Sequence, residues 1–561
     1  MRRALALVVL ALVAFEPAGE GSRAARPLAS AGQVSAAVGR DFVRPGETAP
    51  LPAAVADSVS SLRAERLAAH IAFLSAPSLG GRGLGSDGLE AAADYVAAQL
   101  SLAGVAPAVA RSGGHPLEAY FQPVPLREVR QPGARLTLTR RRGGGPTRRT
   151  VIRPGTGALF PERVPLVVQG PAVFAGYGIR EERPARDDYK GLDVKGKVVV
   201  LLGGLPEGAE WRTPELRSRY DVEGRYRHAA KLALAGSLGA RAVVAIEDEA
   251  FAAELAKEPS TLAPAFFTLA ERETPPLPPV VRVTPAVGGQ ILAGAVPLAS
   301  AGGAAPRALA GLTVSVELTG RERALKSRNV VAVVPGAHPS MKEEAVVLGA
   351  HMDHLGRQGT TYFPGADDNA SGVAALLEIA RAVAASPRPP ARTLVFAFWT
   401  AEEEGHWGAE HYCRHPAWPL ERTAAYLNLD MIGHPWLREE IEKLVADTRL
   451  ERGAEFLAAV DPARFIELGL ADWADDLGPV LLSAARGVGL ALHLDRTGGR
   501  SGGSDYREFA WRGVKFVRFF GNYFPGYHEP IDRVETLDAS QVLRVARLAL
   551  ASAWLVAERT P

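Results

Sequence analysis

The sequence predicts an α/β fold in which a mostly parallel central sheet is flanked by helices, accompanied by a second domain that is mostly β. Two patterns support this expectation. From about residue 329 onward, apolar runs of strand length alternate with segments of helical periodicity, which is typical of parallel sheets covered on both faces. Between about 163 and 315, short apolar strands recur with turn residues between them. The length of 561 residues agrees with two to four domains, at about 150 residues per domain.

The composition excludes several classes of protein. Lys and Arg total 64 against 62 Asp and Glu, so the net charge of +2 gives no electrostatic footprint for nucleic acid. The single cysteine, Cys413, excludes an intramolecular disulfide and any cysteine-based metal cluster. A metal bound by this chain would therefore need His, Asp and Glu as its ligands.

Residues 1–24 are predicted to be a signal peptide. Arg2 and Arg3 precede an uninterrupted apolar run from Ala4 to Ala14, which is too short to span a bilayer easily. We therefore expect an exported protein, secreted or periplasmic, with no stable membrane anchor after signal cleavage. Residues 25–57 are rich in Ala, Pro, Gly and Ser and are predicted to be a linker.

Residues 58–160 are predicted to form the N-terminal part of the larger domain. Apolar spacing indicates helices in two places, and a glycine-rich stretch between them is interpreted as a close-packed turn rather than a phosphate-binding loop. Two alternating runs flank a basic tip and predict a β-hairpin. The predicted elements are helices over 62–74 and 89–102, a turn at 79–86, and a hairpin that pairs 135–139 with 150–152.

Residues 161–320 are predicted to form the second domain, and residues 321–561 the main part of the larger one. In the second domain strands are expected at 171–174, 198–202, 242–246, 280–283 and 312–318, with a helix at 229–238. In the main part strands are expected at 329–334, 345–350, 393–399, 424–429 and 514–520, with helices at 371–384, 403–415 and 540–557. Residues 431–500 are expected to be mostly helical.

Chemically useful side chains follow four of the predicted strands. Because ligand sites in open α/β sheets lie at the carboxyl ends of strands, we expect these side chains to share one edge. Two imidazoles and at least three carboxylates gathered there suit a pair of divalent metals, which a carboxylate can bridge. Glu402 lies beside Glu403, so one can bind metal while the other serves as general base. The strand ends concerned lead to His351, Asp353 and His354, to Glu402, Glu403 and Glu404, to Asp430, and to Tyr527 and His528, and a loop before a helix adds Asp367 and Asp368.

With these motifs in place, the chain resembles the M28 family of dinuclear zinc aminopeptidases, whose fold is of the zinc-exopeptidase type. The resemblance covers residues 327–558. Residues 161–320 resemble a protease-associated (PA) domain inserted into the catalytic fold. The M28 motifs are Gly349-Ala-His-Met-Asp353, Pro364-Gly-Ala-Asp-Asp-Asn-Ala-Ser-Gly372, Ala401-Glu-Glu-Glu-Gly405, Leu427-Asn-Leu-Asp-Met-Ile-Gly433 and Tyr527-His-Glu-Pro-Ile-Asp532. The PA motifs include Gly176-Tyr-Gly178, Asp188-Tyr-Lys-Gly191 and Val194-Lys-Gly-Lys-Val198.

The resemblance implies two Zn²⁺ ions per chain and a complete set of ligands for them. His351 and Asp430 would bind one ion, while Glu403 and His528 would bind the other. Asp368 would bridge the two.

The resemblance also implies the groups around these ligands. Glu402 would be the general base, and Asp353 would orient His351 through its ring N–H. Asp505 resembles a supporting acid that usually precedes a histidine, a position where this chain has Tyr506. Tyr506 and Tyr527 are candidate substrate-pocket residues. The sequence neighbours His354 and His406 are predicted to be pocket or surface residues rather than ligands.

The function expected from the sequence is an exported, zinc-dependent aminopeptidase that removes N-terminal residues from peptide or protein substrates. Metal-bound hydroxide would be the nucleophile and Glu402 the general base. One alternative is a carboxypeptidase or dipeptidase of the same fold, in which Arg357, Arg500 or Arg507 would hold a substrate carboxylate. The other alternative is a non-catalytic, receptor-like module. The complete ligand set favours an enzyme.

Overall fold

The computed structural model describes residues 41–109, 114–141, 145–161, 165–220, 228–257, 265–271, 277–498 and 502–560. The predicted signal peptide and the first part of the predicted linker lie outside these ranges. The chain divides into two compact units. The first comprises the described residues up to Pro125 together with those of Lys326–Pro561, and the second comprises those of Leu126–Leu325.

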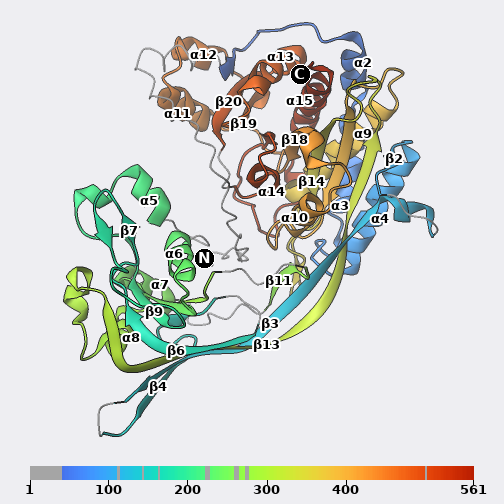
Figure 1. The fold of residues 1–561 in the computed structure, drawn as a ribbon. Coiled ribbons are helices and arrows are strands. Elements are labelled where there is room, and N and C mark those ends of the chain that lie inside the picture. The colour runs from blue at the N-terminus through green and yellow to red at the C-terminus, as the bar shows by residue number, and fades with distance from the viewer. Residues whose placement is uncertain are drawn as a thin grey trace. The chain divides into compact units, whose positions relative to one another are not determined.

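The first unit is built on a mixed sheet with a parallel centre (Figure 1). Neighbouring strands follow the order β2, β13, β17, β14, β18, β21, β19, β20 and β1. The four central strands, from β17 to β21, are parallel, whereas β13 and β19 flank them antiparallel. Their bounds are β1 Phe42–Val43, β2 Ala106–Pro107, β13 Arg307–Val334, β14 Ala345–His351, β17 Thr393–Trp399, β18 Thr423–Leu429, β19 Phe465–Ala471, β20 Ala491–Gly498 and β21 Phe516–Phe519. This arrangement confirms the predicted α/β class.

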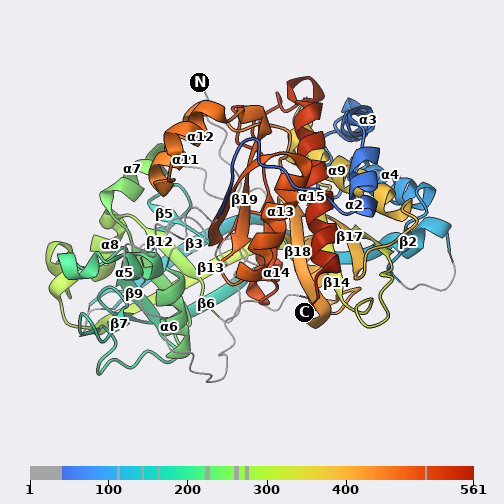
Figure 2. The ribbon, with the colours of Figure 1, turned by 90° about the horizontal axis from the view of Figure 1, so that it is seen from above.

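Helices cover the sheet of the first unit (Figure 2). All seven residues of β14 and of β17 are buried, as expected of central strands covered on both faces. Helices α9 and α15 pack against β14, β17 and β18, while α14 packs against β18 and β21 and also contacts α10. The helices are α2 Ala53–Ser61, α3 Ala64–Leu74, α4 Asp87–Leu102, α9 Gly372–Ala384, α10 Trp407–Arg414, α11 Arg438–Thr448, α12 Gly453–Ala459, α13 Gly478–Val488, α14 Tyr506–Trp511 and α15 Ala539–Glu558.

Helix α15 is long and apolar enough to cross a membrane by length and composition alone. However, 67% of its most apolar window is buried inside the protein, where it packs on the central strands. Its apolar character is thus accounted for by the core of the first unit.

Two expectations for this unit need correction. The prediction that residues 431–500 are mostly helical is wrong, because β19 and β20 lie there and extend the sheet as a parallel pair. A seven-residue run such as Phe465–Ala471, which is apolar apart from Glu467 and Gly469, fits a buried strand and a buried helix equally well. Regular structure also begins inside the predicted linker 25–57, since Phe42 and Val43 are buried and pair with β20, and α2 starts at Ala53.

The second unit combines a parallel sheet with antiparallel strands and short helices. Strands β6, β9, β10 and β12 are parallel, and alternate residues of β9 and β10 enter two different apolar clusters. The predicted hairpin is present as β3 and β4. The second unit includes this hairpin and begins at Leu126, whereas the sequence predicted a second domain that begins at residue 161. Its elements, besides the first part of β13, are β3 Phe121–Arg140, β4 Arg148–Ile152, β5 Ala158–Leu159, β6 Leu166–Phe174, β7 Arg180–Glu181, β8 Arg186–Asp187, β9 Val198–Leu202, β10 Ala242–Ile246, β11 Phe266–Leu269, β12 Val280–Val283, α5 Pro214–Tyr220, α6 Ala229–Ser237, α7 Glu249–Lys257 and α8 Pro285–Leu292.

A buried group of charges lies at the end of β10. Glu247 Oε1 lies 2.7 Å from His228 Nε2 and 2.6 Å from Arg282 Nε, and the Glu247 side chain is only 2% exposed. Burial opposes ionisation of Glu247, but the hydrogen bonds and charges of His228 and Arg282 outweigh it and lower the pKa of Glu247 to about 2. Burial lowers the pKa of His228, despite the nearby carboxylate.

The second unit should therefore lose stability in acid. A depressed pKa of Glu247 stabilises the folded state above about pH 5, and this contribution, about 3 kcal/mol, disappears as the pH falls toward 2. Protonation of His228 adds a loss that begins below about pH 6.5. The stability of the second unit between pH 7.5 and 3 can be measured by hydrogen exchange of the β10 amides, corrected for intrinsic exchange rates. Glu247→Gln should flatten the acidic part of the profile, whereas the exposed Glu254→Gln should not; equal profiles for both variants would contradict the assignment.

Candidate active site

The predicted side chains meet at one edge of the first unit's sheet. His351 ends β14, Glu402 and Glu403 follow β17, and Asp430 follows β18 directly. Since these strands are parallel, their carboxyl ends lie at the same edge. The loop after β21 brings His528 to this edge, and the turn before α9 brings Asp368.

Two imidazoles lie on either side of Asp368. His351 Nε2 lies 3.3 Å from Asp368 Oδ1 and 3.2 Å from Asp430 Oδ1. His528 Nε2 lies 3.1 Å from Asp368 Oδ2 and 3.3 Å from Glu403 Oε2. Each oxygen of the Asp368 carboxylate thus faces a different imidazole and carboxylate pair.

These separations fit two metal ions that share Asp368. Ligand atoms around a tetrahedral ion with bonds of about 2.0–2.1 Å lie about 3.3 Å apart, which matches all four distances. Two groups of side chains that could hold a cation share Asp368: His351 with Asp368 and Asp430, and His354 with Asp368 and Glu403. The five predicted ligands therefore form two adjoining donor sets with a common carboxylate.

The electrostatics of the site reflect crowded negative charge. Burial opposes protonation of His351, but Glu402, Asp430 and Asp368 outweigh it and raise its pKa well above the usual value. Burial raises the pKa of Glu402; the charge of His351 opposes this effect, while the carboxylates of Asp505, Glu403 and Asp430 add to it. Such a cluster attracts cations, and Glu402 is a carboxylate that can take up a proton readily.

Asp353 supports the site differently from the sequence expectation. Its carboxylate accepts hydrogen bonds from the backbone N–H groups of Glu402 at 3.1 Å and Glu403 at 3.2 Å. It is the backbone oxygen of Asp353, not the carboxylate, that lies 3.2 Å from His351 Nδ1. Asp353 therefore holds the Glu402–Glu403 turn and reaches His351 through its main chain. Ala401, just before this turn, has a φ of 55°, a conformation that side chains rarely adopt.

Two supporting residues were not identified from the sequence. Asp532 accepts hydrogen bonds from the backbone N–H groups of Asp367 at 2.8 Å and Asp368 at 3.1 Å, which fixes the turn that presents Asp368. His354 is fully buried, and its Nδ1 lies 2.7 Å from Glu403 Oε1. The Tyr527–Asp532 motif and the His-x-x-His spacing after β14 are the sequence signals that mark them.

Arg82 ties together the loops that carry the ligands. Its buried guanidinium donates from Nε to the carbonyl of Met352 and from Nη1 and Nη2 to the carbonyls of Pro364 and Gly365, each at 2.8 Å. Nη1 also donates to the carbonyl of Leu74. Burial lowers the pKa of Arg82 to about 10, while nearby carboxylates, Asp532 foremost, oppose this effect. The glycine-rich turn is thus a close-packed turn, as expected, with an arginine at its centre.

A cleft lies over the ligands. Both predicted pocket residues line it: Tyr506 is stacked on Phe516, and Tyr527 is stacked on His528. Asp505 is buried nearby, and neither carboxylate oxygen hydrogen-bonds to any residue that the structure describes. Burial raises the pKa of Asp505 well above the usual value.

Two of the three arginines proposed to hold a substrate carboxylate, Arg357 and Arg507, are not among the described residues that line this cleft. Arg357 is exposed on the short strand β15 (Arg357–Gln358), and Arg507 is buried beside Glu508, 3.4 Å away. Arg500 lies outside the described residues. The arginine that does line the cleft is Arg518, on β21.

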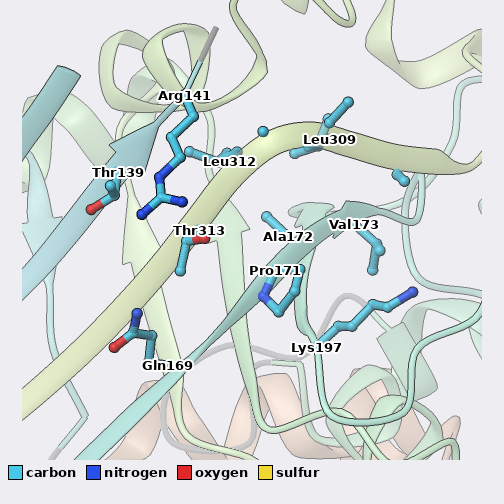
Figure 3. A pocket seen from close by; sticks show the side chains of 13 residues that line it. Thr139, Arg141, Gln169, Pro171, Ala172, Val173, Lys197, Leu309, Leu312 and Thr313 are labelled. Atoms are coloured by element: carbon cyan, nitrogen blue, oxygen red, sulfur yellow. The ribbon is translucent and has the colours of Figure 1, made fainter. Parts of the chain in front are cut away.

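A larger cavity, of about 420 Å³, lies in the second unit. Figure 3 shows Arg141 and Lys197 among its side chains, contributed by different segments of the chain. The described residues of its lining include neither a carboxylate nor an imidazole. The larger cavity therefore lacks metal-ligating chemistry, which is concentrated at the sheet edge of the first unit.

The comparisons with known proteins agree with this site. Residues 329–553 match the model of peptidase family M28, and this range includes every candidate ligand. This match confirms the M28 resemblance.

The chain is also similar to individual proteins. It is 28% identical over 241 residues to leupeptin-inactivating enzyme 1 of Streptomyces exfoliatus, covering 42% of this chain and 49% of that protein. It is 36% identical over 158 residues to the probable lipoprotein aminopeptidase LpqL of Mycobacterium tuberculosis, covering 28% of this chain and 27% of that protein. Among solved structures, it is similar to an aminopeptidase from Aneurinibacillus sp. strain AM-1, at 19% identity and a TM-score of 0.49, covering 89% of this chain and 95% of that one. The chain spans about half, or less, of the length of these curated relatives.

Proposed function

We propose that this protein is an exported aminopeptidase that binds two zinc ions and removes N-terminal residues from peptides. The observation that carries the proposal is the position of Asp368, whose two oxygens face His351 on one side and His528 on the other. Neutral imidazole and carboxylate are good zinc ligands. The N-terminal signal pattern and the relatives' names, which include an aminopeptidase described as a lipoprotein, support export and the reaction.

The chain's own groups suit peptide hydrolysis. When bound, the two ions would supply Lewis acidity toward the scissile carbonyl and lower the pKa of a water molecule. Glu402 Oε2 lies 4.0 Å from His351 Nε2, and Oε1 lies 3.1 Å from His406 Nε2, so its carboxylate is held beside the ligands. Glu402 would accept the proton of the attacking water and return it to the leaving amine. Asp353 keeps Glu402 in place through the backbone of the turn.

One assay can test both the end of the peptide from which residues are removed and the dependence of cleavage on metal. Purified protein is assayed with aminoacyl p-nitroanilides and with N-acetylated peptides that have a free C-terminus, before and after treatment with a zinc chelator. We expect cleavage of the first group only, loss of activity with chelator, recovery on adding Zn²⁺, and two zinc equivalents by mass spectrometry. Chelator-insensitive cleavage would refute the zinc mechanism. Cleavage of the second group alone would establish the carboxypeptidase alternative instead.

The second unit is proposed to be the PA domain. Its strand pattern and its Gly176–Gly178 and Asp188–Gly191 motifs support this assignment. The receptor-like alternative is less well supported, because the five candidate ligands and Glu402 all lie together in the first unit.

A further inference from the structure

The cleft over the candidate ligands contains a guanidinium that the proposed reaction does not use. Arg518 is the only lysine or arginine among the described residues that line the cleft. The same lining includes His351, Asp368, Glu402 and Asp430. A fixed positive charge therefore lies within the space where a substrate would be cleaved.

The sheet register places Arg518 close to the support of Asp430. Arg518 is paired with Asn428 of β18 and with Gly469 of β19, and residues paired across strands project from the same face. Asn428 donates to Ser504 Oγ at 2.9 Å, and this hydroxyl donates to Asp430 Oδ2 at 2.6 Å. Arg518 is thus on the face of the sheet that supports a candidate metal ligand.

The neighbouring strand leaves room for this side chain. A Cβ at Gly469 would lie 2.9 Å from Arg518 Nε and 3.4 Å from its Cζ. A larger residue at position 469 would force the Arg518 side chain to move. The absence of a side chain at Gly469 therefore permits the guanidinium to lie where it does.

The guanidinium of Arg518 has no ionic partner among the residues that the structure describes. The guanidinium carbon, Cζ, lies 5.7 Å from the centre of the Phe520 ring. Arg82, in contrast, donates to four carbonyl groups, and Arg507 lies beside Glu508. A guanidinium keeps its charge and presents a planar fork that matches a carboxylate. A guanidinium without an ionic partner in a substrate cleft is therefore suited to binding a carboxylate of the ligand.

We propose that Arg518 binds a carboxylate of the substrate and makes the enzyme favour peptides that carry one near the cleavage site. This inference rests on the proposed peptidase function and adds the substrate class. Two sources supply the same chemistry: an acidic side chain on the first residue, and the C-terminal carboxylate of a dipeptide. The position of Arg518 within the cleft, rather than at its exposed rim with Tyr523, limits the choice to carboxylates close to the scissile bond.

Two peptide pairs that differ in one carboxylate test the proposal. Glu-Ala-amide is compared with Gln-Ala-amide, and Leu-Ala with Leu-Ala-amide. kcat/KM is measured with the zinc-loaded wild type, and Kd by calorimetry with zinc-loaded Glu402→Gln, in which turnover is slow. In at least one pair we expect the carboxylate to be favoured by about tenfold or more, the range of a charge-assisted hydrogen bond. The first pair identifies a side-chain carboxylate, and the second a terminal one.

Arg518→Met, made in both backgrounds, should reduce that preference to about twofold or less. The matched control Arg388→Met removes an exposed arginine of the same unit and should leave the preference unchanged. The proposal is overturned if neither pair shows a preference, or if the preference persists in Arg518→Met. Absence of turnover with all four peptides, together with an Arg518-dependent difference in Kd, would refute the peptidase function but retain Arg518 as a carboxylate site.

Discussion

Replacing Glu402 with glutamine is expected to lower kcat for an aminoacyl p-nitroanilide by about 10²–10⁴, the usual contribution of a general base. The amide preserves the shape of the side chain but cannot accept the proton of the attacking water. Glu402 is not one of the five proposed ligands, and Asp353 holds its backbone N–H in either variant. The zinc content of Glu402→Gln should therefore remain at two equivalents.

The neighbouring Glu404→Gln is the matched control for this experiment. It makes the same chemical change two residues along the chain, at a side chain that is absent from the lining of the cleft. We expect nearly wild-type turnover from it. Near-normal turnover in zinc-loaded Glu402→Gln would remove Glu402 from its proposed role, whereas loss of zinc from that variant would make Glu402 a ligand.

Replacing Arg82 with methionine is expected to lower the free energy of unfolding by at least about 3 kcal/mol. Buried carbonyls that lose their donors cost about 1–3 kcal/mol each, and Arg82 serves those of Met352, Pro364 and Gly365 as well as Leu74. The carbonyls of Met352, Pro364 and Gly365 belong to the two segments that present His351 and Asp368. We therefore also expect weaker zinc binding, measured by competition with a fluorescent chelator.

Arg82→Lys separates a positioning role from a general loss of stability. Lysine keeps the positive charge, but its single ammonium cannot reproduce the planar fork that spans both loops. It should recover part of the stability and little of the zinc affinity. The exposed Arg63→Met should change neither quantity. If Arg82→Lys binds zinc as tightly as the wild type, Arg82 supports the fold without positioning the ligands.

Four of the five candidate ligands could be located because they follow strands that the sequence predicts, and the M28 motifs select them and Asp368. The runs that become β14, β17 and β18 are mostly apolar, and His351 and Asp430 lie at the ends of two of them. A central parallel sheet then brings such ends to one edge, whatever the details of packing. Strands β19 and β20 were missed within residues 431–500, because charged residues such as Glu467 and Asp495 interrupt their apolar residues.

The supporting groups could not be assigned in this way, because their partners are far away in the chain. Arg82 reaches carbonyls about 270 to 283 residues further on, and Asp532 holds a turn 164 residues before it. His354 is close in sequence to His351, yet it contacts Glu403 instead. No local pattern shows which carbonyl, N–H or carboxylate a side chain will meet.

The sequence by itself thus determined the class of fold, because periodicity reveals it, and the M28 motifs in the sequence supplied the candidate ligands and the proposed general base. Only the tertiary structure decided how Asp368 faces two imidazoles, which atoms of Asp353 serve the site, and which arginine lies in the cleft. No pattern in the sequence distinguishes Arg507 from Arg518. The fold buries one beside Glu508 and places the other, next to Gly469, in the cleft. The physical reason is that contacts between distant segments form only when the sheet assembles.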